Sequence, residues 1–201
     1  MKTIMETRLI RFLDEETERL RDVTEEIMFI EKQFEDRIAL ACGPMAFVYR
    51  VDRVDRFKDG TIMIIDYKTG SRDVMPKAID KIATLPLSRV PIGTIELRSA
   101  SARHFPRDSR IEAIRDNVIS FQVPLYFHYL NKQFKDRPIN AALYNLRTSE
   151  LKTFIGDRPH LGVCPPVPSR EQIDAVFMRA LDFVFAEILD PKVPFVEEEE
   201  V

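Results

Sequence analysis

The sequence predicts an α/β fold in which a central mixed β-sheet is flanked by helices. Apolar residues recur at helical spacing over residues 7–28 and again over residues 110–134. Between these segments, residues 45–56 and 61–69 have the composition of β-strands and are joined by a turn containing Asp59-Gly60, a typical hairpin signal. Helical segments on both sides of a hairpin favour a sheet with helices packed against it.

Further elements are expected along the rest of the chain. Residues 29–34 and 38–42 favour one or two strands that follow the first helix. Residues 70–110 form the least regular part, with a short helix expected over 77–83 and strand residues near 93–97. We therefore expect residues 71–110 to be an insertion into the core fold.

The C-terminal part predicts a second hairpin, over residues 140–147 and 150–155, and a closing helix. Ser169 is expected to cap this helix, with Gln172 completing a capping box, and the helix should run to about residue 189. The glutamates at 197–200 indicate a solvated tail. We expect one domain over residues 1–190, followed by an acidic tail at 191–201.

Composition excludes several classes of protein. With 201 residues, the chain suits one domain and can bury a core without disulfides. Its six glycines are not spaced as in a G-x-G-x-x-G or Walker A loop, and its three histidines form no H-E-x-x-H motif. No serine lies in G-x-S-x-G. These absences argue against a glycine-loop nucleotide site, a zincin and an α/β-hydrolase.

The net charge and the cysteine content limit which cellular compartment and which partners are expected. Two cysteines are too few for a disulfide framework or a four-cysteine iron–sulfur site, which fits a reducing cytoplasm. No apolar run approaches the ~18 residues of a membrane span, so no membrane partner is expected. The net charge is −3. A nucleic acid would therefore have to be held by a local basic patch or by a metal ion.

The chemically informative residues are two aspartates and a lysine in the first predicted hairpin. Asp66 and Lys68 share one face of a strand because they are two residues apart. The turn decides where Asp52 points. A two-residue loop, residues 59–60, would turn Asp52 to the other face, whereas a three-residue loop with Gly60 in a G1 bulge would place it across from Asp66. We predict the three-residue loop.

Two carboxylates that face each other repel, and a divalent cation between them removes the repulsion. Oxygen ligands indicate Mg²⁺ or Mn²⁺ rather than zinc. The alternative is a surface salt bridge among Asp52, Asp66 and Lys68, worth ~0–1 kcal/mol. Apolar residues share the predicted face, which indicates a half-buried surface: Val54, Ile62 and Ile64. Unpaired charge costs more on such a surface, and this weakens the salt-bridge alternative.

These motifs resemble the PD-(D/E)XK nuclease superfamily, specifically its RecB/AddB-type nuclease domains. The similar segments are R-V-D-R-V-D at 50–55 and I-I-D-Y-K-T-G at 64–70. Gln122 and Tyr126 resemble the family's Q-x-x-x-Y helix, and residues 29–34 resemble the glutamate-bearing strand before the core. The resemblance covers roughly residues 31–130 and implies a restriction-endonuclease-like core.

The resemblance also implies roles for individual residues. Asp52 and Asp66 would ligate Mg²⁺ (or Mn²⁺) together with the backbone carbonyl of Tyr67. Lys68 would position or deprotonate the attacking water and stabilise charge in the transition state. Glu31 would be a further acidic residue of the site.

Other residues would contact or orient the substrate. Gln122 and Tyr126, four apart on one helical face, would brace the site or contact the DNA backbone, although Tyr126 also suits a core position. Arg53 belongs to a basic run that could hold phosphates: Arg50, Arg53, Arg56 and Lys58.

Two departures from the family pattern bear on activity. Tyr49 stands where family members usually have glycine, and no histidine precedes His104, although many relatives take a metal ligand from an upstream histidine. Glu18, Glu25 or Glu26 are the acidic residues that could replace that ligand.

We expect a Mg²⁺-dependent deoxyribonuclease, an exonuclease of DNA repair or recombination, which acts with a helicase subunit or a fused helicase domain. The alternative is a catalytically inactive DNA-binding or scaffolding module derived from such a nuclease.

Overall fold

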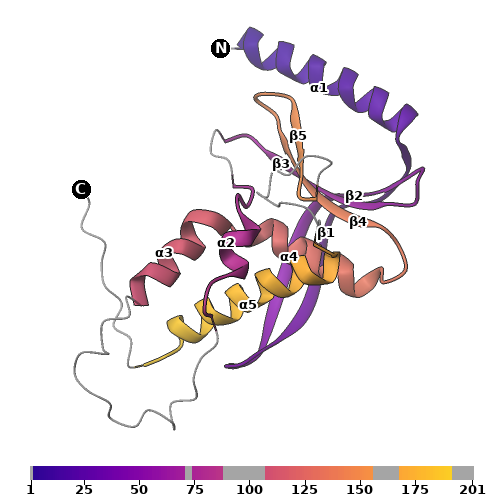
Figure 1. The fold of residues 1–201 in the computed structure, drawn as a ribbon. Helices are drawn as coiled ribbons and strands as arrows, with labels where there is room; N and C mark the ends of the chain where they lie inside the picture. Colours follow the sequence, from indigo (N-terminus) through magenta and orange to yellow (C-terminus); the bar gives the residue numbers. More distant parts are fainter. Residues whose placement is uncertain (1, 71–73, 88–106, 156–167, 192–201) are drawn as a thin grey trace, which may run out of the picture.

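The computed structural model describes residues 2–70, 74–87, 107–155 and 168–191 of the chain (Figure 1). Five strands form one sheet in the order β1-β2-β3-β4-β5. They are β1 (Thr24–Leu40), β2 (Gly43–Phe57), β3 (Ile62–Lys68), β4 (Ile139–Asn145) and β5 (Glu150–Thr153). Only β3 and β4 run parallel, so the sheet is mixed, as predicted.

Among the described residues, five helices flank the sheet, and Figure 1 shows α1 apart from the other four. They are α1 (Lys2–Asp22), α2 (Ile79–Ala83), α3 (Arg107–Val118), α4 (Gln122–Gln133) and α5 (Arg170–Ile188). A mixed sheet with helices against it is the arrangement of a restriction-endonuclease-like α/β core, and the predicted fold class is confirmed. None of the described helices has the length and apolar character needed to cross a bilayer.

Two hydrophobic clusters cover the two faces of the sheet. The larger cluster packs β2, β3 and β4 against α2 to α5 and includes Val54, Ile64, Phe127 and Phe177. The smaller one contains Ile65 and Tyr144, and Phe12 of α1 packs against it. Successive side chains of a strand point to opposite faces, so Ile64 and Ile65 fall in different clusters.

The hairpin between β2 and β3 has the predicted three-residue loop. The Phe57 N–H donates to the Thr61 carbonyl at 2.8 Å, and the Gly60 N–H donates to the Phe57 carbonyl at 2.9 Å. Gly60 has φ +86°, the left-handed conformation of a G1 bulge. The resulting register pairs Arg53 with Ile65 and Val54 with Ile64.

The N-terminal helix begins and ends earlier than expected, and the strand after it is longer. The helix predicted over residues 7–28 ends at Asp22, and β1 begins at Thr24. The last residues of the expected helix are instead paired with β2, where Glu25 and Glu26 form ion pairs with Arg56 at 3.1 and 2.8 Å. These cross-strand contacts stabilise a strand where spacing alone favoured a helix.

The helix expected over residues 110–134 is two helices with a break between them. Ile119 has φ +58°, and α4 starts again at Gln122. Pro124 lies in the first turn of α4, where backbone N–H groups have no intrahelical acceptor. Proline, which lacks an N–H, therefore costs the helix no hydrogen bond at this position. The apolar spacing continues across the break, which is why periodicity missed it.

The remaining predicted elements are present with small shifts. The short helix is α2, the second hairpin is β4–β5, and α5 begins with the predicted capping box. Ser169 accepts from the Gln172 N–H, and the Gln172 side chain accepts from the Ser169 N–H. The expected strand residues 93–97 and the glutamates at 197–200 lie outside the described residues.

Candidate active site

The end of β3 carries a buried carboxylate beside an ammonium group. Asp66 is 3% exposed, and Lys68 is half-buried on the same face. The Lys68 Nζ lies 2.7 Å from Asp66 Oδ2 and donates to Gln122 Oε1, also at 2.7 Å. The ammonium is therefore held between a strand residue and a helix residue that are distant in the sequence.

The first turn of α4 completes this network. Gln122 Nε2 donates to Asp66 Oδ1 and to the Tyr126 hydroxyl, both at 2.8 Å. The Tyr126 hydroxyl lies 3.0 Å from the Arg50 carbonyl and 3.3 Å from Asp66 Oδ1. It has one proton to donate, and the shorter contact points to the Arg50 carbonyl as its acceptor. Tyr126 thereby connects β2, β3 and α4 at one point.

Asp52 lies at the place where β2 separates from β3. The ladder between the strands ends at the Arg53–Ile65 pair, and the Tyr67 N–H donates to Asp52 Oδ2 at 2.8 Å. A side-chain carboxylate thus occupies a position that a ladder carbonyl would have taken. Val51 and Val54 both pack in the larger cluster although they are three apart, so the alternation of β2 shifts by one residue around Asp52.

Burial dominates the electrostatics of this site. It raises the pKa of Asp66, against the opposing effect of the Lys68 ammonium, and the nearby negative charge of Asp52 raises the pKa further. Burial also raises the pKa of the Tyr126 hydroxyl, which stays protonated as a hydrogen-bond donor. A bound cation would relieve the cost of ionising Asp66.

The donor set fits a hard divalent cation. Asp66 Oδ2 is fully buried and has the Lys68 Nζ as an ion-pair partner at 2.7 Å, but it accepts no hydrogen bond of good geometry. Asp52 uses one oxygen for the Tyr67 N–H, and the Tyr67 carbonyl lies beyond the last ladder pair. Carboxylate and carbonyl oxygens are the ligands that Mg²⁺ and Mn²⁺ prefer. Within the described ranges, no group of three or more His, Cys, Asp or Glu side chains gathers, so the two aspartates would need backbone or water ligands beside them.

Two predicted site residues do not join this network. Glu31 is exposed, has φ +45° and forms an ion pair with Arg50 at 3.1 Å. Arg53, expected to contact substrate, is instead buried under α1. Its guanidinium binds the Asp55 carboxylate through two hydrogen bonds of 2.6 Å and also contacts Glu16. Because the alternation of β2 shifts at Asp52, Arg53 points away from the candidate site.

The rest of the basic run is also engaged within the protein. Arg56 is paired with glutamates of β1, and Lys58 donates to the Arg21 carbonyl at 2.6 Å. Tyr49 is buried, with its ring 5.6 Å from that of Tyr129 and 6.5 Å from that of Tyr126. Its ring packs under α4 rather than projecting into solvent. Glu18, the remaining candidate for the missing ligand, is exposed on α1.

Sequence reasoning included the Tyr67 carbonyl but missed two other backbone groups of the site and the buried acid Glu16. The Arg50 carbonyl and the Tyr67 N–H carry no residue-type signal, so only the fold reveals their partners. Glu16 pairs with Arg53 and Arg19 beneath the sheet. Its helical spacing from Phe12 was the one available hint, because residues four apart share a helix face.

Comparison with protein families agrees with this geometry. The model of the PD-(D/E)XK nuclease superfamily matches residues 2–86, which is less than half of the chain. The matched region includes Asp52, Asp66 and Lys68, while Gln122 and Tyr126 lie beyond it. Members of this superfamily are usually nucleases, so the match indicates a nuclease-like function. Comparison with curated proteins gives no match.

Proposed function

We propose that this chain is a metal-dependent DNA nuclease that hydrolyses phosphodiester bonds as RecB/AddB-type nuclease domains do, acting as an exonuclease in DNA repair or recombination. The observation that carries the proposal is the Lys68 ammonium, held between Asp66 and Gln122, with the Asp52 carboxylate bound to the N–H of the intervening Tyr67. An isolated strand salt bridge would not require a half-buried glutamine and a buried tyrosine as further partners.

Asp52, Asp66 and the Tyr67 carbonyl would hold Mg²⁺ or Mn²⁺. Such a cation, when bound, neutralises phosphate oxygens and lowers the pKa of water. Lys68 would add a second positive charge that does not depend on the cation. Gln122 Oε1 accepts from its Nζ independently of Asp66, so Lys68 keeps one anchor when the Asp66 carboxylate serves as a ligand.

Lys68 would act on the reacting groups directly. It is half-buried, so its ammonium can reach both the site and solvent. There it would orient the attacking water or accept its proton, and it would stabilise negative charge that develops on the phosphate in the transition state. Gln122 and Tyr126 would act through Asp66 and Lys68, as positioning residues. The partners we propose are DNA and a helicase subunit or fused helicase domain.

A second candidate is a DNA-binding module without turnover. Tyr49 in place of the usual glycine, and the absence of a third acidic or histidine ligand among the described residues, favour it. Such a module would bind DNA with or without a divalent cation and would leave it intact.

Cleavage of linear duplex and single-stranded DNA in Mg²⁺ or Mn²⁺ tests the proposal. The informative variant is Asp66→Asn, which preserves the shape of a buried side chain, and the matched control is Asp136→Asn, at an exposed loop position. We expect cleavage by the wild type and the control, and its loss in Asp66→Asn. Metal-dependent cleavage that persists in Asp66→Asn would show that the site is assigned incorrectly. Binding without cleavage by the wild type would favour the second candidate.

A further inference from the structure

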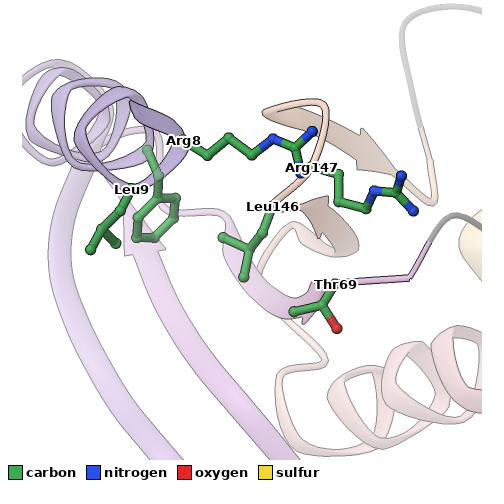
Figure 2. A pocket seen from close by; sticks show the side chains of 6 residues that line it. Arg8, Leu9, Thr69, Leu146 and Arg147 are labelled. Carbon is green, nitrogen blue, oxygen red and sulfur yellow. The ribbon is translucent and has the colours of Figure 1, made fainter. Parts of the chain in front are cut away.

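A pocket lies on the other side of the strand end that carries Lys68. Its cavity of about 360 Å³ is lined by Arg8, Leu9 and Phe12 of α1, by Thr69, and by Leu146 and Arg147 of the β4–β5 turn. Figure 2 shows Arg8 reaching from α1 toward the turn that carries Arg147, with Leu9, Leu146 and Thr69 below them in this view. The pocket thus combines cationic groups on its rim with an apolar wall.

The two arginines of this pocket differ from several arginines near the sheet, which are paired with carboxylates. Arg53 and Arg56 are neutralised by carboxylates, and Arg11 pairs with Glu15 at 2.9 Å. Within the part of the chain that the structure describes, the guanidinium groups of Arg8 and Arg147 form no ion pair or hydrogen bond. Two unpaired guanidinium groups at one rim provide several N–H donors for a phosphate group.

The turn that carries Arg147 is attached to the strand of the candidate active site. The Leu146 N–H donates to the Lys68 carbonyl at 2.9 Å, and Asn145 Nδ2 donates to the Gly70 carbonyl at 3.3 Å. Asn145 Oδ1 accepts from the Arg147 N–H at 2.9 Å. The backbone of Arg147 is therefore fixed relative to Lys68.

The apolar wall indicates a ligand with a flat or apolar part. Leu9 is 56% exposed, although it lies beside the partly buried Phe12 and Leu146. Burying this surface against a base or sugar would contribute to affinity. Simple anions would use the arginines and leave the wall in water.

We propose that this pocket binds a nucleotide of a single-stranded nucleic acid whose scissile phosphate lies at Lys68. Arg8 and Arg147 contact its phosphate, and its base lies against Leu9, Phe12 and Leu146. Thr69 lines the pocket and directly follows Lys68, but the pocket and the Lys68 ammonium lie on opposite sides of the sheet, so one strand would reach both sites by passing around the end of β3. The base must be unpaired to enter the cavity, which makes a single strand the fitting ligand. This inference rests on the proposed nuclease function for the location of the scissile phosphate.

Fluorescence anisotropy with a short labelled single-stranded DNA tests the pocket without cleavage, in buffer that contains EDTA. We expect the variant Arg8→Gln/Arg147→Gln to raise Kd about 10-fold or more and to reduce the slope of log K against log salt by about 0.7 for the lost phosphate contact. Arg37→Gln is the matched control, because Arg37 is an exposed arginine of β1 outside the pocket, and its Kd should stay unchanged. Equal urea midpoints establish that the variants are folded.

The apolar wall has its own test. Leu9→Ser should weaken binding of the normal oligonucleotide and leave binding of an abasic oligonucleotide unchanged. Equal weakening of both would overturn the assignment of this wall to a base.

The outcomes separate this inference from the nuclease proposal. An unchanged Kd in Arg8→Gln/Arg147→Gln, or no DNA binding by the wild type, overturns the pocket assignment even if the wild type cleaves DNA. Arginine-dependent binding by a wild type that never cleaves supports the pocket and refutes the nuclease proposal.

Discussion

The Tyr126 hydroxyl offers a direct test of whether α4 positions the candidate site. Tyr126→Phe retains the buried ring and removes one oxygen, which donates to the Arg50 carbonyl and accepts from Gln122. Gln122 keeps its hydrogen bond to Asp66, so the main loss is the partner of the Arg50 carbonyl.

The expected loss of folding stability follows from this unsatisfied carbonyl. Leaving this partly buried acceptor unsatisfied costs about 1–3 kcal/mol of folding stability. With a urea slope of about 2 kcal/mol per molar for a protein of this size, a loss of 2 kcal/mol lowers the unfolding midpoint by roughly 1 M. We also expect DNA cleavage to fall about 10-fold, because Gln122 loses one of the contacts that orient it toward Lys68.

Urea unfolding and cleavage rates are measured beside Tyr129→Phe as the control. Tyr129 lies one turn further along α4, and within the described part of the chain its hydroxyl has no hydrogen-bond partner. Its removal should change stability by less than about 0.5 kcal/mol. If the two variants have the same midpoint and the same cleavage rate, the Tyr126 hydroxyl does not position the site.

Four further changes test other parts of the structure. The folded protein holds the Asp66 proton more tightly than the unfolded chain does, because folding raises the pKa of Asp66 above its ordinary value of 3.8. The free energy of unfolding of the wild type should therefore fall as the pH rises from 3.8 through the raised pKa. Urea unfolding of Asp66→Asn across the same pH range should lack this decline. Gly60→Ala should lower the free energy of unfolding by about 1–2 kcal/mol, because the φ of +86° is strained for alanine. The added Cβ meets no atom within 4 Å, so backbone strain is the whole expected cost, and an unchanged thermal midpoint would contradict it. Ser169→Ala should cost about 1 kcal/mol by removing the α5 cap, measured as a lower urea midpoint that Ser169→Asn largely restores. Arg53→Met should cost about 3–5 kcal/mol because it leaves the fully buried Asp55 without its bidentate partner, whereas the same change at exposed Arg50 should have little effect on the midpoint.

The hairpin that carries Asp52 and Asp66 was predictable because its register depends on local chemistry. A turn with Asp59-Gly60 offers few backbone solutions, and the position of Gly60 selected the three-residue loop. The same reasoning applies to the α5 cap, where the side chains of Ser169 and Gln172 each accept a hydrogen bond from the other residue's backbone N–H. Both predictions use contacts between residues close in the chain.

The outcome for Arg53 shows where such reasoning fails. Strict alternation predicts that residues 51, 53 and 55 share one face, yet Val51 packs with α4 while Arg53 and Asp55 form ion pairs under α1. The shift occurs where β2 leaves β3 and depends on the pairing of three strands. The basic residues of β2 are consequently neutralised within the protein, whereas Arg8 and Arg147, which no motif singled out, remain unpaired at a pocket.

The sequence by itself determined the α/β class, the β2–β3 register and the residue types able to bind a cation, because propensity, turn chemistry and side-chain period act over a few residues. Only the tertiary structure decided that Gln122 and Tyr126 meet Asp66 and Lys68 and that Arg53 does not. Contacts between distant segments follow from how the sheet and helices exclude water together, and residue spacing does not encode that packing.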